Sequence, residues 1–268
     1  MRVQRAAAIP VITVLSLLAC GLAIQSLTHR WPSEIRTLEQ VLRRLSQGND
    51  LGSQPIAFTV VSGTYTAQLA QQRGLCKDDN CDVFAQLNPY QHYGNGWDEL
   101  IRQGYAFGDI QAWSVSSGTV MIARPSFRAY GPHQDYLACT VAHEIAHYRR
   151  FHIFRQSFHD NHLRRDLSDK ARTLQSLKFT RQQELEADRD AADMLLRAGF
   201  KGRPCQEELA FMHRSVGDGS ITEAESTHPG YEERIAAMRA HYDRILRLPP
   251  RSSAVRRCSC PMTQGTAC

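Results

Sequence analysis

A His-Glu-x-x-His motif at residues 143–147 constrains this chain more than any other feature of its sequence. In a helix, residues four apart lie one turn apart on the same side, so His143 and His147 can bind one metal ion together. Two imidazoles at this spacing are typical zinc ligands, and Glu144 between them can act as a general base toward a water molecule. The alternative is a pair of core histidines whose hydrogen bonds are satisfied by neighbours.

The residues around the motif predict a helix over about 134–150 with two different faces. On a helical wheel, Tyr136, Cys139 and Arg150 lie on the side of the two histidines. The opposite side is apolar, with Leu137, Ala138, Val141, Ile145 and Tyr148. We therefore expect this helix to bury one face in the core and to present metal ligands from the other.

A zinc ion in a catalytic site takes three protein ligands and keeps one position open, so a third ligand must come from elsewhere. The segment from Thr180 to Gly199 predicts a helix, because Thr180 with Gln183 resembles a capping box and Gly199 is a typical stop. On this helix, Glu184 and Asp188 share a side with apolar residues, where a carboxylate is costly unless it is paired or binds a metal. We predict Glu184 as the third ligand, and Asp188 as the acceptor of a hydrogen bond from a ligating histidine.

Glu186 lies on the other side of the same helix, within a stripe of mixed charge that is typical of a solvated face. The stripe also contains Arg189, Asp190, Asp193 and Arg197. For Glu184 and Asp188, the alternative to metal binding is a buried salt bridge with an arginine such as Arg150.

Three segments of the chain, in this order, resemble the peptidase family that contains the CaaX prenyl protease and the heat-shock protease HtpX. They are His143-Glu-Ile-Ala-His147, the pair Glu184 and Asp188 in a Glu-Leu-Glu-Ala-Asp run, and Ser226-Thr227-His228-Pro229 followed by Arg234. The resemblance covers roughly residues 100–245. It implies a gluzincin in which His143, His147 and Glu184 hold zinc.

The same resemblance implies roles for four further residues. Glu144 would be the general base and Asp188 would lie behind a ligand. His228 would lie over the metal, and Arg234 would approach the oxyanion of the reaction. From the residues alone, His228 before Pro229 is equally an ordinary exposed start of a helix.

We predict an α+β fold, mainly α, of the zincin-like metalloprotease type, with a small β-sheet or hairpin beside the active-site helix. The hairpin is expected at Ile110–Ala123, where apolar residues alternate around Ser116-Ser117-Gly118. An exposed edge there could receive an extended peptide by backbone pairing, or the hairpin could only cover the core. Other expected elements are a helix at 33–47, a strand at 56–61, a turn-rich region at 74–108, and helices at 205–214 and 231–248. Residues 151–179 would form helical pieces of a lid or a solvated connection.

The first residues have the pattern of an export signal. Arg2 and Arg5 precede an apolar run from Ala6 through Ala19. Leu17-Leu18-Ala19-Cys20 resembles a bacterial lipobox, in which Cys20 becomes the lipidated N-terminus, and the absence of aspartate at position 21 favours the outer membrane. Cleavage near Ala23 and an uncut anchor running to Leu27 are the alternatives. All three place the remaining chain outside the cytoplasm.

We therefore divide the chain into a lipoprotein-type signal peptide or membrane anchor (1–20), a linker (21–32), a zinc metallopeptidase domain (33–248) and a Cys-rich tail (249–268). Besides Cys20, seven cysteines favour an oxidising compartment. We expect Cys139 to be the unpaired cysteine. The other six allow 15 connectivities, among which the sequence does not choose; Cys76 and Cys81 flank a short polar loop and could close it locally. Cys258-Ser259-Cys260 would form disulfides, with a second metal site as the alternative.

These features predict an exported zinc metalloendopeptidase that holds one Zn²⁺ per chain and hydrolyses proteins or peptides, with a role in protein quality control of the cell envelope. We expect it in the periplasm, attached to the membrane by its N-terminal lipid or anchor. The alternative is a latent zinc protein, with His228 as fourth ligand, that binds peptides as a chaperone or adaptor. A net charge of +5 without a dense basic stripe argues against a nucleic-acid partner.

Overall fold

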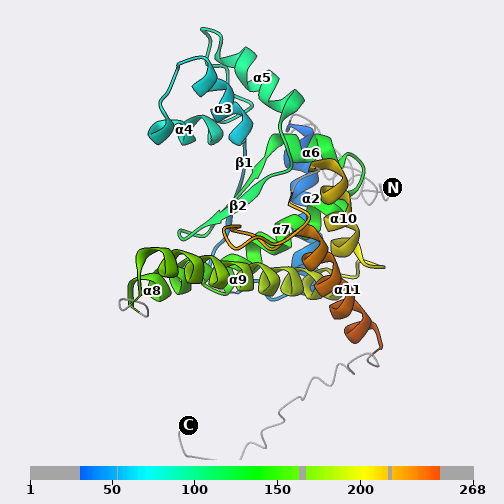
Figure 1. The fold of residues 1–268 in the computed structure, drawn as a ribbon. Coiled ribbons are helices and arrows are strands. Elements are labelled where there is room, and N and C mark those ends of the chain that lie inside the picture. Colours follow the sequence, from blue (N-terminus) through cyan, green and yellow to red (C-terminus); the bar gives the residue numbers. More distant parts are fainter. Residues whose placement is uncertain (1–30, 53, 163–166, 217–218, 248–268) are drawn as a thin grey trace, which may run out of the picture.

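The computed structural model describes residues 31–52, 54–162, 167–216 and 219–247. They form an α+β fold that is mainly α, as predicted (Figure 1). The α-helices are α2 (Ser33–Gly48), α3 (Thr64–Gln72), α4 (Asp82–Ala85), α5 (Trp97–Phe107), α6 (Arg124–Tyr130), α7 (Gln134–Arg149), α8 (His152–His162), α9 (Asp169–Arg197), α10 (Pro204–Val216) and α11 (Tyr231–Arg247). The strands are β1 (Ala57–Val61), β2 (Ala112–Val115) and β3 (Thr119–Ala123), and Asp78–Asn80 forms a 3-10 helix. The predicted signal peptide with Cys20, most of the linker, and the Cys-rich tail lie outside the described residues.

The three described strands form one sheet in the order β1-β3-β2. β3 is parallel to β1 and antiparallel to β2, so the predicted hairpin is present and β2 is an edge strand. The hairpin turn contains Gly118, whose φ of +82° favours glycine. A Cβ on Gly118 would lie 3.0 Å from the ring of Tyr148 on α7, so the turn packs directly on this helix.

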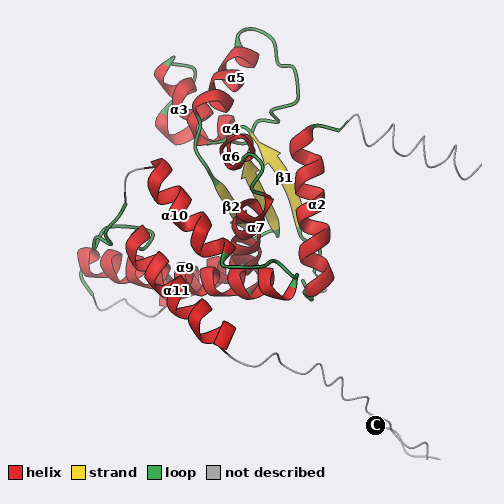
Figure 2. Ribbon diagram, turned by 90° about the vertical axis from the view of Figure 1, so that its right-hand side faces the viewer, coloured by secondary structure: helices red, strands yellow, loops and turns green. Residues whose placement is uncertain are grey.

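The helix α7 lies between the sheet and α9 (Figures 1 and 2). Its predicted apolar face is buried, with Leu137, Val141 and Ile145 in the main core. Toward α9 the contact is made largely by alanines, which are also buried: Ala138, Ala142 and Ala146 on α7, and Ala187, Ala191 and Ala192 on α9. Because alanine side chains are short, the two helices approach closely, and polar side chains beside this contact come within reach of one another.

The region from 74 to 108, predicted to be turn-rich, contains three helical elements that the prediction missed: the 3-10 helix at Asp78–Asn80, the short α4, and α5. Gly94-Asn95-Gly96 does break the chain, but it does so at the start of α5, where Gly96 takes a left-handed conformation. Together with α3 and α4, α5 forms a group of helices above the sheet (Figure 1). This group has a small core of its own that includes Ala67, Cys81 and Ala85.

The predicted start of the helix that carries Glu184 was wrong. The helix α9 begins at Asp169, and its N-cap is Ser168, whose Oγ accepts a hydrogen bond from the backbone of Ala171. Thr180 lies inside the helix, where its hydroxyl donates to the carbonyl of Ser176 one turn earlier. A threonine can satisfy its hydroxyl in this way within a helix, so the resemblance to a capping box did not mark an end.

In the described part of the chain, none of the helices has the length and apolar character needed to cross a membrane.

Candidate metal centre

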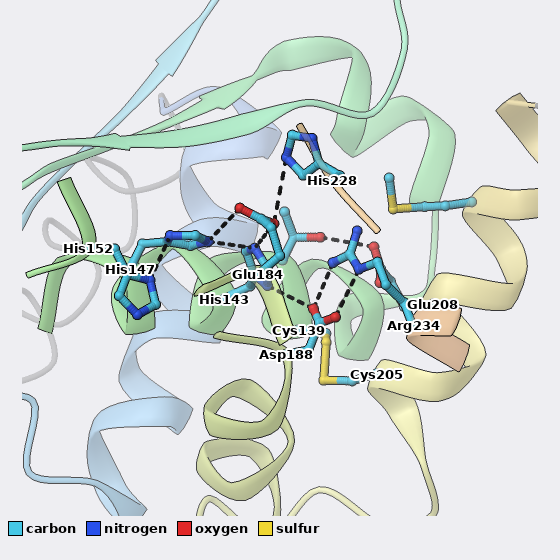
Figure 3. A network of polar contacts seen from close by, with 12 residues as sticks. Cys139, His143, His147, His152, Glu184, Asp188, Cys205, Glu208, His228 and Arg234 are labelled. Carbon is cyan, nitrogen blue, oxygen red and sulfur yellow. Dashed lines mark hydrogen bonds and ion pairs between the residues drawn. A yellow bond between two sulfur atoms is a disulfide. The ribbon is translucent and has the colours of Figure 1, made fainter. Parts of the chain in front are cut away.

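Three side chains from α7 and α9 converge on one point (Figure 3). His143 and His147 come from consecutive turns of α7, and Glu184 comes from the adjacent helix α9. The two histidine Nε2 atoms lie 3.0 Å apart. Glu184 Oε2 lies 3.3 Å from His143 Nε2, and Glu184 Oε1 lies 3.3 Å from His147 Nε2. With all their ligand atoms within 4.8 Å of one another, the three residues form a group that could hold a metal ion.

The spacing of these atoms fits zinc. Zinc binds histidine nitrogen and carboxylate oxygen at about 2.0–2.2 Å, so two ligand atoms at a tetrahedral angle are about 3.3 Å apart. The observed separations of 3.0 and 3.3 Å match such an edge. Two histidines and one carboxylate are also a known ligand set of catalytic zinc sites that keep one position open.

Asp188 lies behind His143, one turn after Glu184 on α9. Its Oδ1 is 2.9 Å from His143 Nδ1. Arg234 of α11 donates two hydrogen bonds to Asp188, from Nε at 2.8 Å and from Nη2 at 2.6 Å. Burial opposes the ionisation of Asp188, yet the Arg234 guanidinium and the His143 ring hold its pKa below the usual value. A charged Asp188 fixes the orientation of His143 and directs its Nε2 toward the ligand group.

The carboxylates give this site a preference for positive charge. Burial acts to lower the pKa of His143, but Asp188 and Glu184 raise it to about 10. Burial acts to raise the pKa of Glu184, but hydrogen bonds from His143 and His147 hold it well below its usual value. A cation bound between these side chains would therefore be stabilised by two buried negative charges.

The far side of His147 contacts a different set of residues. His147 Nδ1 lies 3.0 Å from Nδ1 of His152, a buried residue at the start of α8. His152 Nε2 lies 3.4 Å from Glu186 Oε2. Burial and the neighbouring positive charges of His147 and Arg155 lower the pKa of His152 to about 4. His152 is therefore uncharged at neutral pH.

The structure contradicts the alternative of a salt bridge between Arg150 and the pair Glu184 and Asp188. Arg150 binds Asp190 through Nε at 2.5 Å and also approaches Glu186 at 3.4 Å. These ion pairs agree with the predicted charged stripe on α9, except that Glu186 is largely covered, with 13% of its side chain exposed. The buried salt bridge to Asp188 is made by Arg234.

A cavity of about 710 Å³ opens in front of the ligand group. Glu144, next to the first ligand, lines it together with Trp113 from β2 and Tyr231 from α11. His228 lies across the cavity on the segment before α11, and its Nε2 is 3.6 Å from Glu184 Oε2 (Figure 3). Glu144, the predicted general base, and His228, predicted to lie over the metal, thus line the same cavity as the predicted ligands His143 and Glu184.

The edge strand β2 forms one wall of this cavity. Gln111, Ala112 and Trp113 line it, and β2 pairs with β3 on its other side. Among the described strands, β2 has no second neighbour, so the backbone groups on its outer edge are not paired with another strand of the sheet.

Cys139 is not the unpaired cysteine that the sequence predicted. It forms a disulfide with Cys205 at the start of α10, with a Cα–Cα distance of 5.3 Å. The wheel correctly placed Cys139 on the ligand side of α7, but α10 also packs against that side and brings its own cysteine. The local disulfide Cys76–Cys81, one of the pairings that the sequence left open, is present.

A second buried carboxylate, Glu208, lies near the floor of the cavity. It accepts a hydrogen bond of 2.5 Å from the hydroxyl of Tyr130, and the hydroxyl of Thr140 lies 3.3 Å from the same oxygen. Burial raises the pKa of Glu208. Glu208 was not predicted as a site residue, because nothing in its local sequence pattern separates it from the exposed Glu207 beside it.

The structure brings the predicted ligands His143, His147 and Glu184 together with Glu144, Asp188, His228 and Arg234 around one cavity. The predicted lipidation site, Cys20, lies outside the described residues. His152 and Glu186 were missed as parts of the site. A third histidine five residues after His147 was a visible signal for His152, but its direction depends on the turn between α7 and α8.

Residues 167–242 match the model of peptidase family M48. The matched segment is less than a third of the chain and contains Glu184, Asp188, His228 and Arg234, whereas the His-Glu-x-x-His motif lies before it. The match supports the resemblance to zinc metallopeptidases that the motifs predicted. None of the curated proteins compared with the chain matches it.

Proposed function

We propose that this protein is a zinc-dependent endopeptidase. The observation that carries the proposal is the convergence of His143, His147 and Glu184 at zinc-ligand spacing, beside a cavity that His143, Glu184 and Glu144 line. The match to peptidase family M48, which covers the segment with Glu184, supports it independently. Zinc bound at this site would supply a Lewis acid that polarises a peptide carbonyl.

Glu144 is the proposed general base. It follows His143 on α7, and its side chain lines the cavity. There it takes a proton from the water that attacks the peptide carbonyl and passes it to the leaving amine. A protein that only binds peptides has no need of a carboxylate at this position.

We propose that the substrate binds along β2 as an extended strand. The outer edge of β2 offers backbone donors and acceptors beside the cavity, and backbone pairing gives affinity with little dependence on sequence. Trp113 offers an apolar contact next to this edge. This mode of binding suits an enzyme that acts on many different unfolded proteins.

His228 and Arg234 have different proposed roles. His228 faces the ligand group across the cavity, where its imidazole can donate a hydrogen bond to the developing oxyanion. Arg234 lines the cavity, but its guanidinium is already committed to Asp188 by two hydrogen bonds. This commitment favours a role in holding Asp188 behind His143 over direct contact with the oxyanion.

The proposed location and physiological role rest on the sequence alone. The N-terminal pattern with Cys20 supports an exported protein attached to the membrane of the cell envelope. The two disulfides of the described chain agree with an oxidising compartment. A peptidase with little sequence preference in this compartment suits protein quality control.

Turnover of a casein-type substrate by the wild type and by Glu144→Gln tests the proposal. We expect the wild type to cleave and Glu144→Gln to lose nearly all activity while it keeps zinc, because the substitution removes the base but no ligand. Glu207→Gln, the same change at an exposed position on α10, is the matched control and should behave like the wild type. Equal activity of Glu144→Gln and wild type would remove the peptidase proposal.

The short distance between His228 and Glu184 also favours a second candidate, a latent form with His228 as a fourth ligand. In that form the position for the attacking water is filled. His228→Ala would then gain activity, whereas the oxyanion role predicts a loss.

A further inference from the structure

A series of side-chain contacts leads from His147 away from the candidate metal site. Its Nδ1 atom is 3.0 Å from His152 Nδ1, and His152 Nε2 faces Glu186 Oε2 at 3.4 Å. The contact between His152 and Glu186 is long, and His152 Nε2 makes no closer hydrogen bond within the described residues. Glu186 is in turn held by Arg155 at 3.0 Å.

The turn between α7 and α8 places the ring of His152 against His147. Between α7 and α8, Phe151 takes a left-handed conformation with φ of +55°, which costs an L-residue about 1–2 kcal/mol. The side chain of Phe151 is 65% exposed, so its own packing does not offset this cost. The turn directs His152 inward, where only 2% of it is exposed.

A second contact fixes His152 from α9. The backbone carbonyl of His152 accepts a hydrogen bond of 3.1 Å from the side-chain amide of Gln183, the residue before Glu184. The same stretch of α9 therefore supplies the ligand Glu184, the anchor Gln183 and the carboxylate Glu186. A strained turn and a dedicated anchor are more than a core histidine needs for packing alone.

The tautomers follow from the ligand role of His147. If Nε2 of His147 binds the metal, the proton of its neutral ring must be on Nδ1. Nδ1 of His152 must then accept that proton's hydrogen bond, and the proton of His152 must be on Nε2, where it faces Glu186. In this arrangement His147 donates a hydrogen bond to His152, and His152 in turn donates one to Glu186.

We infer that His152 is a positioning residue that holds His147 in the orientation and tautomer needed for metal binding, with Glu186 behind it. His143 already has such a partner in Asp188, so the two histidine ligands are supported from different directions by different chemistry. Removal of a hydrogen-bond partner of a metal-binding histidine typically weakens metal affinity 10- to 100-fold. The inference rests on the proposed zinc site.

The test is zinc affinity, measured by competition with a chelator, for the wild type and two substitutions of His152. His152→Asn keeps an acceptor at the place of Nδ1, whereas His152→Leu keeps comparable bulk without an acceptor. We expect about 10- to 100-fold weaker binding for His152→Leu and a clearly smaller loss for His152→Asn, which keeps the acceptor for His147 but loses the contact with Glu186. His162→Leu, the same change at an exposed histidine of α8, is the control and should not alter affinity.

Glu186→Gln tests the last contact in the series from His147 through His152 to Glu186. In the wild-type background it should weaken zinc binding, and in the His152→Asn background it should have no further effect, because asparagine has no Nε2 proton to reach Glu186. Comparing Glu186→Gln in these two backgrounds tests the inference even if His152→Leu fails to fold. Thermal unfolding of the metal-free variants would show whether it folds.

The outcomes separate this inference from the proposed function. Wild-type affinity in His152→Leu, or equal weakening in His152→Asn and His152→Leu, overturns the inference and leaves the zinc site intact. A wild type that binds no zinc overturns both.

Discussion

The disulfide Cys139–Cys205 lies close to the candidate metal centre (Figure 3) and closes a long loop of the chain. It joins α7, one turn before His143, to the start of α10, and both cysteines are buried. In the chain-entropy description, a cross-link stabilises a protein by restricting its unfolded chain, and the effect grows with the length of the loop. For a sequence separation of 66 residues this amounts to about 4 kcal/mol, and for the separation of 5 residues in Cys76–Cys81 to about 2 kcal/mol.

The double substitution Cys139→Ala with Cys205→Ala should therefore lower the free energy of unfolding by about 4 kcal/mol. For a chain of this size, such a loss corresponds to a decrease in Tm of about 8–16 °C. Thermal unfolding of the metal-free protein, followed by circular dichroism, measures it. The matched variant, Cys76→Ala with Cys81→Ala, should lose about half as much. Reduced wild type, which keeps all sulfur atoms, isolates the cross-link from the small cavities that the alanines leave.

Two results would refute this reasoning. The first is a double variant of Cys139 and Cys205 whose Tm equals that of the wild type. The second is a larger loss for the short loop than for the long one. Either would mean that the cross-link does not restrict the unfolded chain as described, or that it does not form.

Three further predictions concern single residues around the cavity. Arg234→Ala leaves the charge of Asp188 buried without its partner and should cost about 3–5 kcal/mol of stability in chemical denaturation, and unchanged stability would exclude the buried ion pair. His228→Ala should lower kcat about 10²-fold in peptide hydrolysis while zinc content stays at the wild-type level, and loss of zinc would instead make His228 a ligand. Burial raises the pKa of Glu208, so the folded protein keeps a proton that the unfolded chain releases above pH 4.5. Wild type should therefore lose stability relative to Glu208→Gln as the pH rises from 4.5 to neutrality, and a difference in Tm that is independent of pH would contradict this assignment.

Local periodicity, combined with the cost of burying charge, predicted where Glu184 and Asp188 lie. The wheel separated Glu184 from Glu186 because one carboxylate lay among alanines and the other among charged residues, and the structure places Glu184 against the two histidines. The same reasoning placed Asp188 behind a histidine. It worked because α7 and α9 bury small residues, and the carboxylates beside them on α9 lie within reach of the histidines on α7.

The predictions that failed depend on contacts between distant segments. The wheel showed that Cys139 lies on the ligand side of α7, but not that α10 packs there with Cys205. Thr180 followed by Gln183 looks like the start of a helix, and only the continuation of α9 back to Ser168 shows otherwise.

His152 shows the same limit within the site. Its position after His147 is visible in the sequence, but its ring contacts His147 only because Phe151 takes a left-handed conformation. Phenylalanine rarely adopts this conformation, so neither its identity nor its neighbours predicted the turn.

The central claim is that His143, His147 and Glu184 bind one metal ion together. Metal analysis of the purified protein beside Glu184→Gln tests it most directly. We predict about one zinc per chain in the wild type and a marked loss in the variant, because the substitution removes a charged ligand but keeps the shape of the side chain. Full zinc content in Glu184→Gln, or none in the wild type, would contradict the claim.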